Sequence, residues 1–205
     1  KLNMKQLLKY NNIKLLNTNF YFDKNITFEY DKENSIFNIY QKYSGARVYF
    51  RGGSLNNVLI NFFGLPDAIN KPLNNYPFDN KGLTGCMSFV DLKFQNVSIK
   101  SYNSNCEDSV NLINTTGYIN KFESENSVKD SLDIDFSNIK IGKVFINKAG
   151  NDCVDLSSGE YEFGELNLSE CDDKALSAGE KSSVKLKNFQ VLQSKIGLSS
   201  KDSSI

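Results

Sequence analysis

The chain has 205 residues, with 24 Lys and Arg against 24 Asp and Glu, so its formal net charge is zero. This balance provides no basic field for a nucleic acid, and no apolar run approaches the length of a membrane span. Histidine is absent, which removes the usual general base and the commonest transition-metal ligand. Any chemistry therefore depends on carboxylates, Lys, Arg, Tyr or the backbone.

The N-terminal residues 1–12 are expected to form a short cap. Leu2, Met4, Leu7 and Leu8 follow the spacing of an amphipathic helix. Such a helix would cover the apolar end of a repetitive fold, which the terminal units of a solenoid require.

Residues 13–64 are expected to form irregular first coils, of which 48–64 is the clearest. All three prolines fall in residues 65–82. Because proline cannot donate a hydrogen bond within a parallel ladder, we expect a protruding loop there. Asparagine is abundant throughout, and it suits left-handed turns that stack on one another.

A repeat of about 22 residues fills 83–205. Its leading aspartates are separated by 22, 22 and 21 residues, and each precedes a short alternation of apolar and polar residues. Period-two alternation predicts a strand with one face inward, and three such alternations in each repeat predict three short strands. The repeat thus predicts an all-β, single-stranded right-handed parallel β-helix. The expected core column is Val110, Leu132, Val154, Ala175 and Ile196.

Other apolar residues are also expected in this core, namely Phe136, Phe145, Phe163 and Phe189. The four cysteines show no CxxC spacing, so a zinc site is not expected. Buried thiols are the simpler interpretation of the cysteines, and disulfides remain open. The last coil is incomplete at Ile205, so we expect the solenoid to be truncated there.

The leading aspartates are expected to stack in a column with a rise of about 4.8 Å per coil. At that distance two carboxylates repel by about 1 kcal/mol in water, so the column needs an offset. In one alternative each aspartate accepts backbone N–H groups at its corner. In another, Ca²⁺ bridges two coils through Asp130, Asp133, Asp152 and Asp155. In the third the column is a catalytic cluster, with candidates Asp130, Asp152, Asp173 and Lys174.

A second column, Asn111, Asp133 and Asp155, is expected three positions after the first. Lys174 is expected to project beside the first column, where its charge would neutralise part of it. No other cofactor is expected.

Several motifs resemble the right-handed parallel β-helix repeat regions of bacterial exported and surface proteins, some of which are linked to CotH-type proteins. The resemblance covers about residue 82 to the end and is carried by CEDSVNLINTTG, SLDIDF, GNDCVDLSSG, DDKALSAGEKS and IGLSSKDSS. It implies a β-helix in an export context. It implies no kinase activity, because the chain has no nucleotide-binding loop.

A weaker similarity is to polygalacturonase-like glycoside hydrolases. Asp130 falls at the first of their motifs, residues 151–153 at the second, residues 173–175 at the third, and residues 194–196 near the fourth. This resemblance implies a pair of catalytic carboxylates. Asn151 stands where the general acid is expected, Lys174 replaces the family's histidine, and the arginine is absent.

We therefore expect one β-helix domain over 1–205, acting as a non-catalytic module that binds a polysaccharide or another surface protein. A carbohydrate-active enzyme (polysaccharide lyase, glycoside hydrolase or epimerase) and a purely structural scaffold are the alternatives. Neither a nucleic-acid partner nor a membrane span is expected. The expected location is extracellular, at the cell surface or periplasmic.

Overall fold

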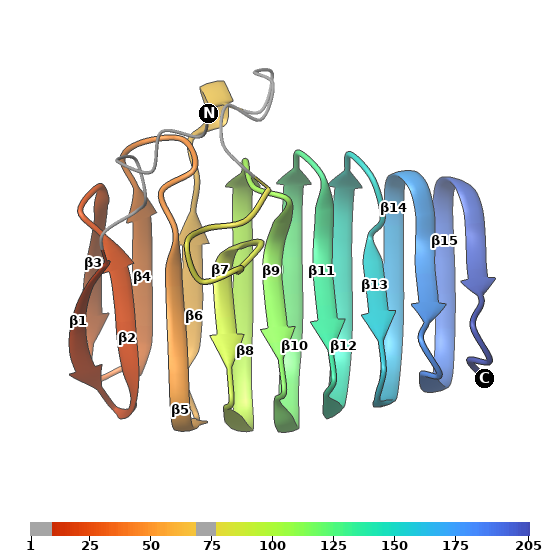
Figure 1. The fold of residues 1–205 in the computed structure, drawn as a ribbon, viewed down its shortest axis with the longest axis horizontal. Helices are drawn as coiled ribbons and strands as arrows, with labels where there is room; N and C mark the ends of the chain where they lie inside the picture. Colours follow the sequence, from red (N-terminus) through yellow and green to blue (C-terminus); the bar gives the residue numbers. More distant parts are fainter. Residues whose placement is uncertain (1–9, 69–76) are drawn as a thin grey trace.

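The computed structural model describes residues 10–68 and 77–205. The chain is 72% strand and winds into a β-solenoid of about 7 turns with mostly parallel pairing, which confirms the expected fold class. Successive coils lie side by side from β1 to β15 (Figure 1). The N-terminal helix predicted within 1–12 falls almost entirely outside the described residues.

The solenoid begins with antiparallel pairing. β1 (Tyr10–Leu15) pairs with β2 (Asn17–Asp23), and β3 (Ile26–Asp31) pairs with β4 (Ile36–Gln41). β2 also runs antiparallel to β5, whereas all later pairings, starting with β4–β6 and β5–β7, are parallel. The irregular coils expected in 13–64 are therefore two hairpins followed by the first parallel coil.

Each regular coil contains a short strand and a long strand that bends into two faces. The short strands form one continuous sheet, and the long strands form the other two sides. Their bounds are β5 (Val48–Asn56), β6 (Leu59–Phe63), β7 (Gly85–Val90), β8 (Lys93–Ser104), β9 (Asp108–Ile113), β10 (Thr116–Ser127), β11 (Asp130–Asp135), β12 (Asn138–Ala149), β13 (Val154–Ser157), β14 (Glu160–Gly179) and β15 (Ser183–Ser200).

Asparagines occupy several corners, as their abundance predicts. Asn57 and Asn96 both have φ near +50°, at 48° and 56°, a conformation that asparagine tolerates better than most residues. The Asn96 amide donates to Asn57 Oδ1 at 2.9 Å, so the two corners are joined across neighbouring coils.

The core column matches the prediction over three coils and then departs from it. Leu132 pairs with Val110 and Val154, and all three are fully buried. Val154 pairs with Leu176 instead of the predicted Ala175, and Leu176 pairs with Leu198 instead of Ile196. The interval stays at 22 residues, so the prediction was one residue out of register at Ala175 and two at Ile196. Ala175 is nevertheless fully buried in the core, whereas Ile196 in the last coil is 43% exposed.

The phenylalanines divide between inside and outside. Phe163 is fully buried and Phe189 packs against the core, as predicted. Phe136 was wrongly placed, because it sits at a corner with φ of 50° and is 62% exposed. Phe145 was also wrongly placed: it lies on the outer side of β12, between the inward Val144 and Ile146.

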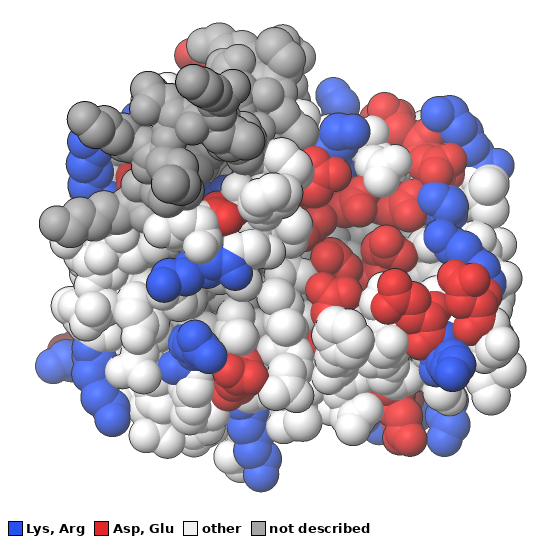
Figure 2. All heavy atoms as spheres, in the orientation of Figure 1, with Lys and Arg blue, Asp and Glu red and all other residues white. Residues whose placement is uncertain are grey.

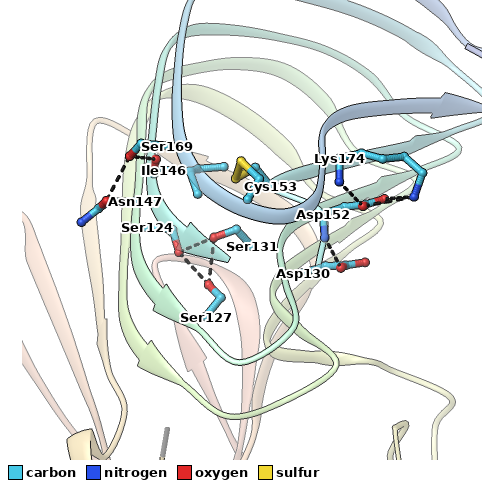
Figure 3. Close-up of a disulfide and its surroundings, with 11 residues drawn as sticks. Ser124, Ser127, Asp130, Ser131, Ile146, Asn147, Asp152, Cys153, Ser169 and Lys174 are labelled. Atoms are coloured by element: carbon cyan, nitrogen blue, oxygen red, sulfur yellow. Dashed lines mark hydrogen bonds and ion pairs between the residues drawn. A yellow bond between two sulfur atoms is a disulfide. The ribbon is translucent and has the colours of Figure 1, made fainter. Parts of the chain in front are cut away.

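One corner of the interior is polar and crosslinked. Ser124, Ser127 and Ser131 form a closed triangle of hydrogen bonds of 2.7 to 3.1 Å (Figure 3). Disulfides join Cys86 to Cys106 and Cys153 to Cys171, and all four cysteines are buried. The cysteines are therefore disulfide-bonded, and the simpler interpretation of free thiols was wrong.

The described part of the proline-containing segment contains no strand and has one short 3-10 turn, Pro66–Ala68. Residues 77–84 lie against the sheet of short strands, crossing in front of it (Figure 1). Arg47 Nη1 donates to the Leu83 carbonyl, and the Tyr10 hydroxyl donates to Asp79 Oδ2, both at 2.6 Å. This half of the segment is packed onto the solenoid.

No helix in the described ranges has the length and apolarity needed to cross a membrane.

Candidate functional site

The outer surface of β9, β11 and β13 carries a cluster of aspartates, here named the carboxylate face. Val110, Leu132 and Val154 point inward, so the residues that alternate with them, Asp133 and Asp155 among them, point out. The leading aspartates stand two residues before these inward positions, at the corner where each coil begins. Figure 2 shows the acidic side chains gathered over this part of the solenoid. The members are Asp108, Asp130, Asp133, Asp135, Asp152 and Asp155.

The first predicted column exists, but its fourth member is different. Asp108 pairs with Asp130, and the Asp152 N–H donates to Asp130 Oδ1 at 2.9 Å. The Lys174 N–H donates to Asp152 Oδ1 at the same distance, so Lys174 continues the column (Figure 3). Asp173, predicted to be in the column, instead donates its N–H to the carbonyl of Asn151 and lies beside it.

These contacts give the carboxylates a structural role. Asp130 and Asp152 each accept a backbone N–H from the next coil, which resembles the predicted corner cap displaced by one coil. Asn151 adds a second donor to Asp130 Oδ1 at 2.6 Å. Asn151, which stands where a glycoside hydrolase would place its general acid, therefore acts as a hydrogen-bond donor to Asp130.

Lys174 neutralises the C-terminal end of the column. Its Nζ lies 3.2 Å from Asp152 Oδ2 and 2.6 Å from Asp173 Oδ2, and only 19% of its side chain is exposed. The hydrogen bond to Asp173, followed by that to Asp152, raises the pKa of Lys174. A lysine held in the charged form is suited to ion pairing and unsuited to acting as a general base.

The second predicted column is present as expected. Asp133 pairs with Asn111 on one side and Asp155 on the other. The Asn111 amide donates to Asp133 Oδ2 at 3.0 Å and to Asp135 Oδ2 at 3.2 Å. Asn111 is fully buried, so this amide holds two carboxylates together beneath the surface.

Several aspartates of the carboxylate face have pKa values above the ordinary range for aspartate. Burial, together with the charge of neighbouring acidic groups, raises the pKa of Asp130 to about 6, of Asp108 to about 7 and of Asp133 to about 10. Burial likewise raises the pKa values of Asp135 and Asp152. The face therefore retains protons near neutral pH, because too few cations lie close enough to offset its charge.

The predicted calcium ligands are largely engaged by other groups. Asp130 binds Asn151 and a backbone N–H, and Asp152 binds Lys174. Within residues 10–68 and 77–205, no three or more acidic, cysteine or histidine side chains converge as a metal-binding group.

A second candidate site, which the sequence reasoning missed, is a shallow groove on the outer surface of the last part of the long strands. We name it the lateral groove. Its volume is about 830 Å³, and it crosses five successive coils, through β8, β10, β12, β14 and β15. Its outward side chains include Tyr102, Glu125, Phe145, Asn147, Asn167 and Gln190.

Pairing between coils places these groove residues in two rows. Phe145 stands between Glu123 and Asn167, and Asn147 stands between Glu125 and Ser169. The second row continues towards the N-terminus as a stack of rings, Tyr40, Phe63 and Tyr102, with centroids 5.3 and 5.5 Å apart. Phe145 lies between two apolar residues that alternate inward, and this position in the sequence was the available signal that its ring faces outward.

Two acidic groups beside the groove, Glu123 and Glu165, are paired with lysines, whereas Glu125 makes no ion pair with a described residue. Burial of Glu123 opposes ionisation, but hydrogen bonds from Lys100 and Lys121 outweigh it and lower its pKa. Hydrogen bonds from Asn167 and Lys143 lower the pKa of Glu165. The groove therefore presents amides, hydroxyls, rings and neutralised carboxylates.

No family model, no curated protein and no solved structure matches this chain.

Proposed function

We propose that the protein is a non-catalytic module of an exported or surface protein that holds an extended polysaccharide in the lateral groove. The observation that carries the proposal is the repetition, coil after coil, of outward amide, hydroxyl and aromatic side chains along this groove. Solenoids bind extended partners along such faces, because each coil offers similar groups at a constant spacing of about 4.8 Å.

The chemistry of the lining suits a hydroxyl-rich, uncharged polymer. Asn147, Asn167 and Gln190 each offer both a donor and an acceptor. Phe145 and Tyr102 offer apolar ring surface of the kind that packs against the C–H faces of sugars. Glu123 and Glu165 are paired with lysines, so neither carboxylate needs a charged ligand to offset it, which suits a neutral polymer.

The two disulfides support export, because such bonds persist in oxidising compartments. The sequence likeness to β-helix regions of bacterial surface proteins points the same way. We infer an extracellular, cell-surface or periplasmic location.

Affinity electrophoresis tests the proposal with soluble xylan, mannan, mixed-linkage β-glucan and polygalacturonate. We expect retardation by at least one neutral polymer. Phe145→Ala should weaken binding about 10-fold or more, the loss of about 1.4 kcal/mol of contact free energy. Phe136→Ala is the matched control, since Phe136 is an exposed ring at a corner outside the groove.

Three results would overturn it. Binding to none of the polymers, or equal weakening by the two phenylalanine variants, would remove the lateral groove as the site. Release of new reducing ends from a bound polymer, lost in Asp130→Asn, would favour the alternative of a carbohydrate-active enzyme acting through the carboxylate face, where burial raises the pKa of Asp130 to about 6.

A further inference from the structure

Three side chains at the N-terminal edge of the carboxylate face carry buried polar atoms that make no hydrogen bond. They are Ser88 Oγ, Asp108 Oδ2 and Asn111 Oδ1. Ser88 and Asn111 are 0% exposed and Asp108 is 3% exposed. A buried polar atom without a partner costs about 1–3 kcal/mol, so three together call for a bound species that satisfies them.

Strand pairing brings these three residues around one point. Ser88 pairs with Asn111 across β7 and β9, and Gly85 pairs with Asp108 in the same ladder. A Cβ atom on Gly85 would lie 2.6 Å from Ser88 Oγ and 3.1 Å from Asn111 Cβ. The missing side chain of Gly85 lets the Ser88 hydroxyl and Asn111 approach the backbone that pairs with Asp108, and we name this neighbourhood the Gly85 cradle.

Asp108 differs from the other members of its column. Asp130 and Asp152 each accept an N–H from the coil above. The N–H that would serve Asp108 belongs to Asp130, but it donates to the Glu107 carbonyl at 3.0 Å instead. One oxygen of Asp108 is consequently left without a donor, while a hydrogen bond with Thr84 engages the side chain from the other side.

The surroundings of the cradle are predominantly negative. Asp130, Glu107 and Asp135 all act electrostatically on Asp108, and Asp133 is in turn affected by Asp108. Arg47 is the cation that interacts with Asp108 from the side of the packed segment. These carboxyl groups outnumber the one guanidinium, so a bound cation that displaced the protons they retain would be favoured over a bound water.

We propose that a hard divalent cation, of which calcium is the best fit, binds in the Gly85 cradle through Asp108 Oδ2, Asn111 Oδ1 and Ser88 Oγ. The three groups are a carboxylate, an amide carbonyl and a hydroxyl, all oxygen donors of the type that Ca²⁺ accepts, with water completing its 6–8 ligands. The cation lies where residues 77–84 meet the sheet, so it joins that segment to the solenoid. This site is distinct from the bridging set predicted from the sequence.

Thermal melting and calorimetric titration with CaCl₂ test the proposal, using the full chain first treated with EDTA. We expect single-site binding and a rise in melting midpoint of about 5 °C or more at saturating calcium. The rise should be larger at pH 8 than at pH 6, because protons compete with the cation for Asp108.

Asp108→Asn is the test variant, because it keeps the shape of the side chain and relieves repulsion in the metal-free protein. It should remove most of the calcium-dependent rise. Asp155→Asn on the same face is the matched control and should retain it. Absence of a calcium effect in the unmodified protein would overturn the proposal in favour of bound water, and a full effect in Asp108→Asn would place the ion elsewhere.

Discussion

The carboxylate face and the lateral groove are built by the same repeat, but carboxyl pKa values are raised on the first and lowered beside the second. On the carboxylate face, Asp133 lies between Asn111 and Asp155, and burial raises its pKa to about 10. Beside the groove, Glu165 pairs with Lys143, and hydrogen bonds from Asn167 and that lysine lower its pKa. At Glu165 the first of these hydrogen bonds comes from Asn167 on the same strand and the second from Lys143 in the neighbouring coil. At Asp133 burial acts first, and aspartates of its own strand and of neighbouring coils add to it. The electrostatics of a solenoid face are therefore set by burial and by neighbours both within a strand and between coils.

Breaking the shared core beneath both faces should have the largest effect. Leu132→Asp places an unpaired charge in a fully buried position and should cost more than about 5 kcal/mol, enough to unfold the surrounding coils. Asp133→Asn, the neighbouring outward position, should leave stability equal or higher, because it removes a carboxyl held in the protonated form. Urea denaturation followed by circular dichroism measures both. A folded Leu132→Asp variant would contradict the inward assignment.

A change of pH should have the next largest effect, because the carboxyl groups of the two faces have pKa values shifted in opposite directions. A raised carboxyl pKa means that the folded protein binds protons that the unfolded chain has released above about pH 4. The stability that these protons confer is present at low pH and is lost as pH rises through the folded-state values of about 6 for Asp130 and about 7 for Asp108. For Asp108 alone the loss is on the order of 4 kcal/mol.

Urea denaturation at pH 5 and pH 8 in EDTA measures the part of this loss that falls between the two conditions, and the protein should be the more stable at pH 5. The Asp108→Asn variant should show a smaller difference between the two conditions. Greater stability at pH 8 would contradict the raised carboxyl pKa values, because the lowered pKa values of the ion-paired glutamates change stability only below about pH 4.5.

Removing one lysine from each face gives the smallest effects and sharpens the comparison. Lys174→Met leaves Asp152, which is 3% exposed, without its ion pair and should cost about 2 kcal/mol. Lys143→Met breaks a 3.3 Å pair whose side chains are 58% and 36% exposed, so its effect should fall within measurement error. Equal losses would show that burial does not distinguish the two pairs.

The sequence was sufficient to predict the solenoid and most of the carboxylate face. A strict interval places Asp130 and Asp152 in one column, because parallel pairing joins equivalent positions of successive coils. The prediction failed at Asp173, because that residue was aligned with the other aspartates by its type, whereas the inward residues of the core determine the register. Val154 must pair with another inward residue, and Leu176 satisfies this only if Lys174 continues the column.

The groove and the cradle were harder to predict for physical reasons. The apolar character of Phe145 favours the core, but its position between two inward residues places it on the outer surface. The structure follows the position in the alternation. The cradle depends on the acceptor to which the Asp130 N–H donates and on the pairing of Gly85 with Asp108. Both are contacts between coils that residue types alone do not specify.

The disulfides have a mechanical consequence, because each one joins residues within a single coil. Cys86 and Cys106 are 20 positions apart, and Cys153 and Cys171 are 18 apart, so each bond closes a ring of slightly less than one coil. If the two ends of the chain were pulled apart, coils would peel off in turn, but the residues inside these two rings would not lengthen. The solenoid would then extend in unequal steps, with two short ones marking the crosslinked coils. Reduction of the disulfides would restore those two steps to the length of the others.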